Sequence, residues 1–390
     1  MPSALATPAL EGFDESLLSH AERSQSLERF ATTRSGREKP SRYWKYDLED
    51  LSLSDLSIDA GNGSVSIGTT PERVIACDLL TAARKHADLF ARAFAQGIQP
   101  EHKFAHLTRA FAQLGAFVYV PAECSVDEPI VITYRVDAGK AIFPYTVLLL
   151  EDGARATFIE RIEAGENAFV AGITEAVGGA GSQLTYAAVQ DAPADARLLF
   201  TRVARPGRDS SAAWTTAELG AALSVSDLVV TVDAPGIDAQ ISTLFFPSGS
   251  QHVDIVTTVD HRIGDSTSQT LVKSAANGAG QGRYLGNIRI APNAQRTDAN
   301  LRDDAFLLSK RAHIDSIPAL EIAANDVKAY HGATIGSLDD EQIFYMTSRG
   351  IERSEAERMI ALGFFEPVID RFPTQALREE LRAVLQRKVE

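Results

Sequence analysis

The sequence predicts a mainly β protein whose long, strand-rich middle is flanked by helical regions. Between about residue 115 and residue 330, short runs rich in Val, Ile, Thr and Phe are alternating or wholly apolar, which is typical of strands. Turns rich in Gly, Asp, Asn and Pro separate these runs. No helical periodicity interrupts the runs, whereas helical spacing appears before and after them.

The N-terminal region, residues 1–114, is expected to be mostly helical. An apolar stripe predicts a short helix over residues 17–30. Thr70 followed by Pro71 predicts the start of a second helix, because threonine caps helices and proline suits the first turn. A further helix over residues 104–114 ends before a glycine.

Residues 115–330 are expected to form one strand-rich core. A parallel βαβ fold needs a helix between successive strands, so that class is disfavoured and a sandwich or a solenoid remains. The many Ala, Gly, Ser and Thr residues suit a solenoid, in which each coil buries its inner face against its neighbours. No strict repeat decides between the two. The strand-like runs are Phe117–Val120, Ile130–Tyr134, Tyr145–Leu150, Leu184–Val189, Leu228–Val232, Gln240–Phe246, His252–Val259 and Asn287–Ile290.

Residues 331–390 are expected to form a C-terminal helical region. Ser337 and Asp340 resemble a capping box that opens a helix reaching Arg349. A second helix is expected from Ser354 to about Leu362. A last helix follows Pro373 and Thr374, with an apolar stripe made of Leu377, Leu381, Val384 and Leu385.

Composition excludes several classes of function. The net charge of −14 disfavours a nucleic-acid or anionic-membrane partner. Two cysteines, Cys77 and Cys124, without a C-x-x-C motif exclude a disulfide framework and a self-contained zinc site of that type. No P-loop motif is present, so we expect no direct nucleotide binding. Without a signal-like N-terminus or an apolar run of roughly 20 residues, a cytoplasmic location is expected.

Four stretches between residues 100 and 370 occur in the order found in one known family. They are Lys103–Ala105 with Gly115–Pro121; His252–Asp254 with Thr257 and His261; Gly282–Tyr284 with Thr297–Ala299; and Pro318–Ile322 with Asp326–Lys328 and His331–Thr334. Together they resemble the SufB/SufD family of iron–sulfur cluster assembly scaffolds. The resemblance implies a right-handed parallel β-helix core flanked by N-terminal and C-terminal helical regions.

The resemblance also implies partners. His331-Gly332-Ala333-Thr334 is similar to the SufD type, whereas SufB-like chains carry a cysteine-containing motif there. We therefore expect a non-catalytic, SufD-like subunit of a SufBCD complex, with a SufB-like paralogue and a SufC-like ABC ATPase as partners. ATP hydrolysis would belong to the ATPase, and a homodimer is an alternative for the isolated chain.

His331 is the candidate cofactor-binding and metal-ligating residue. The resemblance places it at the seam between the two scaffolds, where a transient iron–sulfur cluster would form, and a neutral imidazole can ligate iron. If residues 327–331 are extended, Val327, Ala329 and His331 share one face. Ala329 stands where many SufD-like chains have cysteine, so the partner would supply the thiolates. Alternatively, His331 only hydrogen-bonds across the seam.

The C-terminal helices carry the candidate partner-binding residues. The resemblance implies that part of their surface receives the ATPase, and aromatic residues dominate such interfaces. Docking on the chain's own core is the alternative. The candidates are Phe344, Tyr345, Arg349, Gly350, Phe364 and Phe365.

The other polar residues are expected to be structural. His252 and His261 should lie on opposite faces of a strand and bond a turn or a neighbouring coil. Asp303 and Asp304 are expected to be solvated or capping charges.

Two rival functions are weighed against the scaffold. A β-helix carbohydrate enzyme is disfavoured, because Asp254 and Asp260 on one strand would be about 20 Å apart, too far for paired carboxylates. A pure adaptor without cluster contact stays open because of Ala329.

Overall fold

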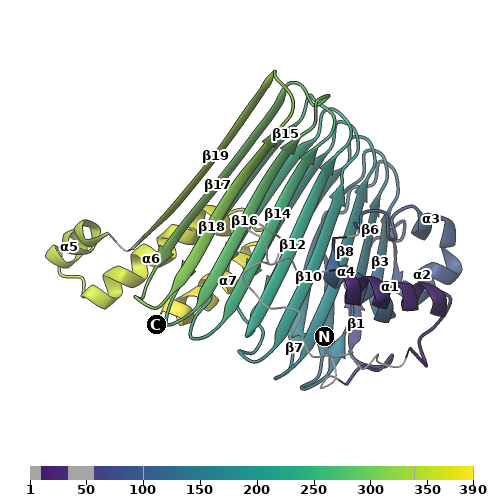
Figure 1. Ribbon diagram of the computed structural model, residues 1–390, viewed down its shortest axis with the longest axis horizontal. Helices are drawn as coiled ribbons and strands as arrows, with labels where there is room; N and C mark the ends of the chain where they lie inside the picture. Colours follow the sequence, from purple (N-terminus) through teal and green to yellow (C-terminus); the bar gives the residue numbers. More distant parts are fainter. Residues whose placement is uncertain (1–9, 34–56, 100, 338, 390) are drawn as a thin grey trace.

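The computed structural model describes residues 10–33, 57–99, 101–337 and 339–389. Within these ranges the chain forms a parallel β-solenoid with helices at both ends, as the resemblance implied (Figure 1). The solenoid alternative is therefore confirmed over the sandwich.

Helices lie before and after the strands of the solenoid. The helices are α1 (His20–Thr32), α2 (Leu79–Lys85), α3 (Ala87–Ala91), α4 (Lys103–Phe111), α5 (Asp340–Ser348), α6 (Arg353–Ile369) and α7 (Gln375–Val389). The strands are β1 (Ser64–Ile67), β2 (Ile75–Asp78), β3 (Gly115–Val120), β4 (Ile130–Val136), β5 (Ala141–Ile142), β6 (Tyr145–Leu150), β7 (Arg155–Ala164), β8 (Phe169–Gly178), β9 (Gln183–Gln190), β10 (Arg197–Arg205), β11 (Ser211–Glu218), β12 (Leu223–Val232), β13 (Asp238–Phe245), β14 (His252–His261), β15 (Thr267–Ala276), β16 (Gln281–Ile290), β17 (Thr297–Leu307), β18 (His313–Ile322) and β19 (Val327–Ser337).

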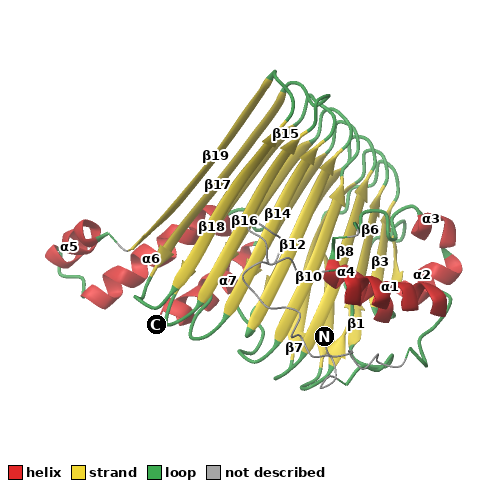
Figure 2. Cartoon of the chain, in the orientation of Figure 1, coloured by secondary structure: helices red, strands yellow, loops and turns green. Residues whose placement is uncertain are grey.

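The strands form two facing sheets, because each coil gives one strand to each (Figure 2). One sheet has the order β1-β4-β7-β9-β11-β13-β15-β17-β19, and the other has the order β18-β16-β14-β12-β10-β8-β6-β3-β2. Pairing between successive coils is parallel, whereas β1–β4 and β2–β3 at the first end are antiparallel.

The interior between the sheets is filled by apolar side chains stacked coil upon coil. Small residues occur where a ring or branched chain from a neighbouring strand already occupies the space. A Cβ on Gly172 would lie 2.8 Å from the Phe200 ring, and one on Gly286 would lie 2.4 Å from Leu301 Cδ1. The coils therefore interlock, and burial of this apolar surface is the main stabilising term.

A buried polar chain crosses the middle coils. Glu160 accepts a hydrogen bond from the Tyr186 hydroxyl at 2.8 Å. Arg202 donates to Tyr186 at 3.3 Å, to Ser226 at 2.7 Å and to Glu218 at 3.4 Å. Charges removed from water must be compensated in this way, and the matched partners favour one register of the coils.

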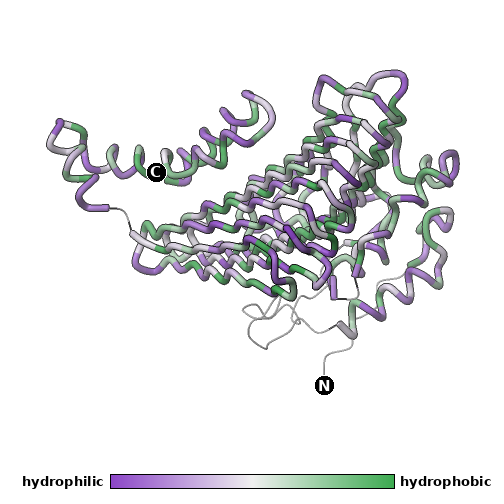
Figure 3. Tube along the Cα trace, turned by 90° about the horizontal axis from the view of Figure 1, so that it is seen from above, coloured by the Kyte–Doolittle hydropathy of each residue, from purple (hydrophilic) through white to green (hydrophobic). Residues whose placement is uncertain are grey.

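Helices cover the outer faces of both sheets, on opposite sides of the solenoid (Figure 3). On the ten-stranded sheet, Phe111 of α4 packs against Phe143 with ring centroids 4.8 Å apart. On the nine-stranded sheet, α6 and α7 bury an apolar layer that includes Phe365 and Leu381. The Arg161 guanidinium of β7 donates two hydrogen bonds to the Glu380 carboxylate of α7, at 2.9 and 2.7 Å. This bidentate ion pair helps to hold α7 against the sheet.

Several helix boundaries differ from the sequence expectation. The helix predicted at Pro71 does not begin there: that proline lies in a turn closed by Val74 N–H, and β2 pairs with β3 before α2 starts. The cap of α2 is Asp78, whose carboxylate accepts from the backbone of Thr81 at 2.9 Å. Tertiary strand pairing here overrides a local start signal.

The C-terminal helical region also begins later than expected. Ser337 is the last residue of β19 and not a helix cap, so the strand continues past position 331. Asp339 caps α5, accepting from Glu341 N–H at 2.9 Å. Pairing with β17 over its whole length extends β19, because each further residue adds a ladder contact.

Candidate assembly surface at the open end of the solenoid

The solenoid ends at two edge strands, which we call the open end: β18 (His313–Ile322) and β19 (Val327–Ser337). In the part of the chain that the structure describes, β18 pairs with β16 alone and β19 with β17 alone. Their outer edges therefore present unpaired backbone N–H and C=O groups (Figure 1).

Large apolar side chains are exposed at the same edge. Tyr330 is 59% exposed, Ile335 is 47% exposed and Ile322 of β18 is 42% exposed. Proteins usually blunt long edges with charges, bulges or short strands, because such an edge recruits another chain. A long, apolar, unpaired edge therefore indicates an interaction surface.

His331 lies in the middle of this edge. In the register with β17, Ala329 aligns with Ala299 and His331 aligns with Leu301, so all four face the solenoid interior. The expected alternation along β19 is confirmed. His331 is nevertheless exposed, because no further coil covers it among the described residues.

Asp303 follows Leu301 by two residues on β17, so its side chain also faces the solenoid interior, and it is fully buried. Its Oδ2 accepts a hydrogen bond from Ser316 of β18, which reaches across the interior from the opposite sheet. Its Oδ1 has no hydrogen-bond partner among the described residues. Burial raises the pKa of Asp303 to about 7, despite the opposing effect of Ser316.

The expectation that Asp303 is solvated or capping is therefore wrong. The residues Thr297, Ala299, Leu301, Asp303 and Ala305 alternate along β17, and all are buried. That period-two pattern was the available signal: it places Asp303 on an apolar face, whereas its neighbour Asp304 points outward.

Asp304 belongs to a hydrogen-bonded cluster on the outer face. Lys273 donates to it at 2.7 Å, Arg302 at 2.8 Å and Thr334 of β19 at 2.7 Å. Burial alone would raise the pKa of Asp304, but these hydrogen bonds outweigh it, so the pKa is lowered. The cluster ties β19 to β17 from outside and holds the open end in register.

The candidate partner-binding residues of α5 are exposed. Phe344 is 73% exposed and Tyr345 is 60% exposed, and the Arg349 guanidinium lies 5.1 Å above the Tyr345 ring. Gly350 ends the helix with a φ of +88°, a conformation that favours glycine. Ile343 is buried and faces the rest of the molecule.

The two phenylalanines of α6 lie elsewhere. Phe365 is fully buried between Phe246 and Phe306, so it is not an exposed anchor. Phe364 is partly buried, packs edge-on against Phe306 at 4.5 Å and lies 4.4 Å from the Lys273 ammonium. These residues dock α6 on the chain's own core, which is the alternative that the sequence left open.

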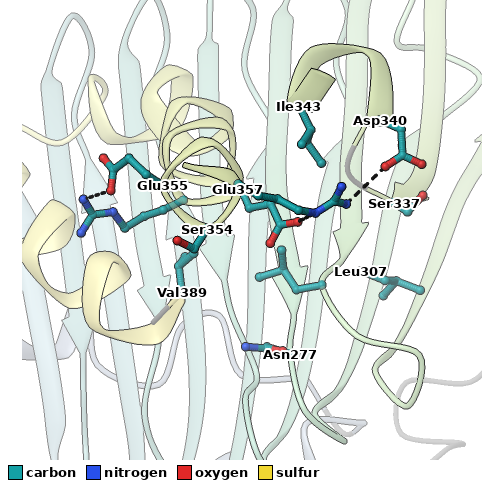
Figure 4. A pocket seen from close by; sticks show the side chains of 12 residues that line it. Asn277, Leu307, Ser337, Asp340, Ile343, Ser354, Glu355, Glu357 and Val389 are labelled. Carbon is teal, nitrogen blue, oxygen red and sulfur yellow. Dashed lines mark hydrogen bonds and ion pairs between the residues drawn. The ribbon is translucent and has the colours of Figure 1, made fainter. Parts of the chain in front are cut away.

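A groove of about 680 Å³ separates α5 and the start of α6 from the solenoid (Figure 4). Arg353 lies in it and pairs with Glu357 at 2.7 Å and with Asp340 of α5 at 3.4 Å. Exposed pairs of this kind contribute about 0–1 kcal/mol. The connection between α5 and the core is therefore weakly restrained.

His261 has a structural role, as expected. His261 is fully buried, with Ser266 and Ser268 each 2.9 Å from one ring nitrogen. Burial lowers its pKa to about 4, so the ring is neutral near pH 7. His252, at the other end of β14, is partly exposed.

The described residues contain no group of three or more His, Cys, Asp or Glu side chains arranged to hold a metal ion. No helix among the described residues combines the length and apolar character needed to cross a bilayer.

Comparisons with known proteins match most of the chain, and the family models together span residues 59–364. The model of the SUF system FeS cluster assembly, SufBD core domain, matches residues 133–364. The model of the SufBD protein N-terminal region matches residues 59–132. The core-domain model runs from within β4 to within α6, so it includes β5 to β19, the open end and α5.

Curated relatives agree with the family models. The iron–sulfur cluster assembly protein SufD of Bacillus subtilis (strain 168) is 30% identical over 323 residues, which are 81% of this chain and 74% of the relative. The iron–sulfur cluster assembly protein SufB of the same organism is 24% identical over 312 residues, 79% of this chain and 67% of the relative. An iron–sulfur cluster assembly SufBD family protein of Staphylococcus epidermidis (strain ATCC 12228 / FDA PCI 1200) is 24% identical over 316 residues, 80% and 68% of the two chains. With its parallel solenoid and these matches, the chain belongs to the SufB/SufD family of iron–sulfur cluster assembly proteins and is SufD-like.

Proposed function

We propose that this chain is a non-catalytic, SufD-like scaffold that supports iron–sulfur cluster assembly together with a SufB-like paralogue and a SufC-like ABC ATPase. The observation that carries the proposal is the open end, where the outer edge of the long strand β19 has no partner strand among the described residues and exposed apolar side chains lie beside it.

Pairing with a paralogue follows from the chemistry of that edge. A second solenoid with a similar end can add its strands to β18 and β19, which satisfies the backbone groups on both sides. Tyr330, Ile335 and Ile322 would then be removed from water. Because each is only about half exposed, each would contribute roughly half of the about 1.5–3 kcal/mol that full burial of such a side chain gives.

The nascent cluster is the cargo of such a complex. His331 would supply one imidazole ligand from this side of the seam. Ala329 on the same face offers no thiolate, so the sulfur ligands would come from the partner.

The ATPase would bind the exposed face of α5, where Phe344 and Tyr345 supply aromatic anchors. The groove behind α5 gives this helix room to move relative to the solenoid. ATP-driven closure of two ATPase subunits would then twist the two scaffolds and open the seam.

Co-purification tests the assembly. The tagged chain, co-expressed with both partners, is expected to capture the paralogue and the ATPase in a complex that survives gel filtration. Failure to capture either partner, with ATP, with ADP and without nucleotide, would overturn the proposal.

Anaerobic reconstitution separates the scaffold from the pure adaptor, an alternative that Ala329 leaves open. We expect the His331→Ala complex to lose most of the visible cluster absorption, whereas His20→Ala, which changes an exposed histidine at the start of α1, keeps it. Equal absorption in the wild type and both variants would favour the adaptor.

A further inference from the structure

A second pocket, of about 540 Å³, lies on the outer face of the nine-stranded sheet beside the open end. Its floor is formed by β15, β17 and β19, and Arg371, in the turn after α6, also lines it. His331 faces the solenoid interior, so the pocket lies on the other face of β19. Its volume is in the range of about 300–1,000 Å³ that is typical of small-molecule sites.

Two guanidinium groups in this pocket have donors to spare. Arg302 donates from Nε to Asp304 at 2.8 Å, and its two terminal nitrogens have no partner among the described residues. Arg371 donates from Nη1 to the Ser242 hydroxyl at 3.1 Å, and no carboxylate of the described ranges pairs with it. An anion in the pocket would therefore meet arginine donors that the fold leaves unused.

The pocket carries a local excess of positive charge in an acidic chain. Lys273, Arg302 and Arg371 supply three positive charges there. Asp304 is the single carboxylate among the described residues that line the pocket, so the local net charge is +2, whereas the whole chain carries −14. A concave site of one sign concentrates ions of the opposite sign.

Neutral donors lie in a row across the floor. Gln269 aligns with Asn300, and Asn300 aligns with Tyr330, so the three side chains stand on adjacent strands about 4.8 Å apart. Both amide side chains are exposed, and neither has a hydrogen-bond partner within the described ranges. Amide and phenol groups can donate to an anion from this row.

Gly332 lets the Tyr330 phenol lie along the floor. A Cβ at position 332 would be 2.7 Å from the Tyr330 hydroxyl oxygen, so the ring occupies the space that a larger residue would fill. Gly332 aligns with Arg302 in the register of β19 and β17. The phenol hydroxyl therefore lies on the same row as Arg302.

The two arginines stand on either side of Leu271. Ser242, which Arg371 contacts, aligns with Leu271, and Leu271 aligns with Arg302. The Cα atoms of Ser242 and Arg302 are thus two strands apart, roughly 10 Å. An anion above Leu271 would lie between the two guanidinium groups, with the Leu271 side chain and the Tyr330 ring as apolar surface for an organic substituent.

We propose that this pocket binds a phosphate group, with Arg302 and Arg371 holding its oxygens and the amides of Gln269 and Asn300 completing the hydrogen bonds. The planar fork of arginine matches phosphate oxygens in pairs. A phosphate carries a charge of about −1.5 to −2 near pH 7, which balances the local +2, whereas a carboxylate carries only −1.

Isothermal titration calorimetry of the full chain with phenyl phosphate tests the proposal, at pH 8 so that the phosphate is a dianion. The wild type is expected to bind one equivalent. Arg302→Gln and Arg371→Gln should each weaken binding at least tenfold, because each removes charge-assisted hydrogen bonds. Arg155→Gln is the matched control: it changes an exposed arginine of β7 in the same sheet, four strands from β15, and should bind as the wild type does.

Two further probes define the ligand. Benzoate has the same ring with a planar monoanion, and it is expected to bind at least tenfold more weakly than phenyl phosphate. Orthophosphate separates two sources of the same chemistry: binding as tight as that of phenyl phosphate indicates free phosphate, and weaker binding indicates a phosphate ester whose organic part contacts Leu271 and Tyr330.

Three results would overturn the inference: no saturable binding of either phosphate probe, equal binding of benzoate, or unchanged binding in both arginine variants. Thermal unfolding checks each variant. Should Arg302→Gln fail to fold because Asp304 loses a partner, Arg371→Gln decides the outcome, since Arg371 is exposed and contacts only the Ser242 hydroxyl among the described residues. Partner capture is a separate measurement, so a chain that captures both partners and binds no phosphate would refute this inference alone.

Discussion

Among five buried ionisable side chains of the solenoid, four have matched polar atoms and one, Asp303, is left incomplete. Glu160, Arg202 and Glu218 satisfy one another and nearby hydroxyls in the middle coils. His261 has a serine at each ring nitrogen. Asp303 alone of these five retains an oxygen without a described partner, and it is the one next to the proposed assembly surface.

The neutral ring of His261 should make stability depend on pH. Its folded pKa, about 4, lies below the unfolded value of 6.5, so the folded state binds fewer protons between these values. The contribution is fully present above pH 6.5 and is lost as the pH falls toward 4. We expect the wild type to lose about 2 kcal/mol more than His261→Gln between about pH 7.5 and pH 5.

Urea unfolding of both proteins at the two pH values measures this difference in the free energy of unfolding. The His261→Gln variant lacks the titrating imidazole, whereas the carboxylates titrate equally in both proteins. An identical pH dependence in the two proteins would show that the ring is protonated without penalty in the folded state.

At the scale of elements, the C-terminal helices serve two different purposes. Helices α6 and α7 are part of the fold, because they cover the outer face of the nine-stranded sheet. Helix α5 stands away from it across the groove (Figure 4). Its Phe344 and Tyr345 rings are exposed. Phenylalanine therefore stabilises the fold in α6, whereas in α5 it is exposed, where we propose that it binds a partner.

Two phenylalanine substitutions should separate these roles. Phe365→Ala removes a fully buried ring and is expected to destabilise the protein by about 3–5 kcal/mol. Phe344→Ala should change stability by no more than about 0.5 kcal/mol, because the ring is 73% exposed, yet it should weaken ATPase capture. Chemical denaturation and pull-down on both variants make the comparison, and a large loss of stability in Phe344→Ala would contradict it.

At the scale of the whole molecule, the solenoid is closed at one end and open at the other. Antiparallel β1 and β2 turn the chain back at the first end, whereas β18 and β19 leave the last coil uncovered by any described strand. A further coil could be added to the end of a parallel stack without changing the coils before it. An uncovered last coil can therefore accept strands from another chain.

The isolated chain is expected to self-associate weakly through this edge. Ile335→Lys places a charge among the exposed apolar groups of β19 and should shift the protein to monomer. Ile263→Lys, a similarly exposed isoleucine in the turn after β14, is the matched control and should behave as the wild type. Sedimentation velocity over a range of concentrations follows the change, and equal association of both variants would place the contact elsewhere.

Much of this architecture was readable from the sequence, because it rests on local patterns. Alternating apolar residues predicted the strands, and the stripe of Leu377, Leu381, Val384 and Leu385 predicted the buried face of α7. The alternation through Ala329 and His331 predicted which residues share a face, because a strand has a period of two wherever it lies.

Only the tertiary structure decided which predicted faces were covered and which were left open. Phe364 and Phe365 belong to one helical pattern, yet the position of β17 buries the second ring between Phe246 and Phe306. Asp303 became a buried, incomplete carboxylate because a strand from the opposite sheet lies across from it. Periodicity fixes the direction of a side chain relative to its own strand or helix, whereas burial depends on residues distant in the chain, and those meet only when the coils stack.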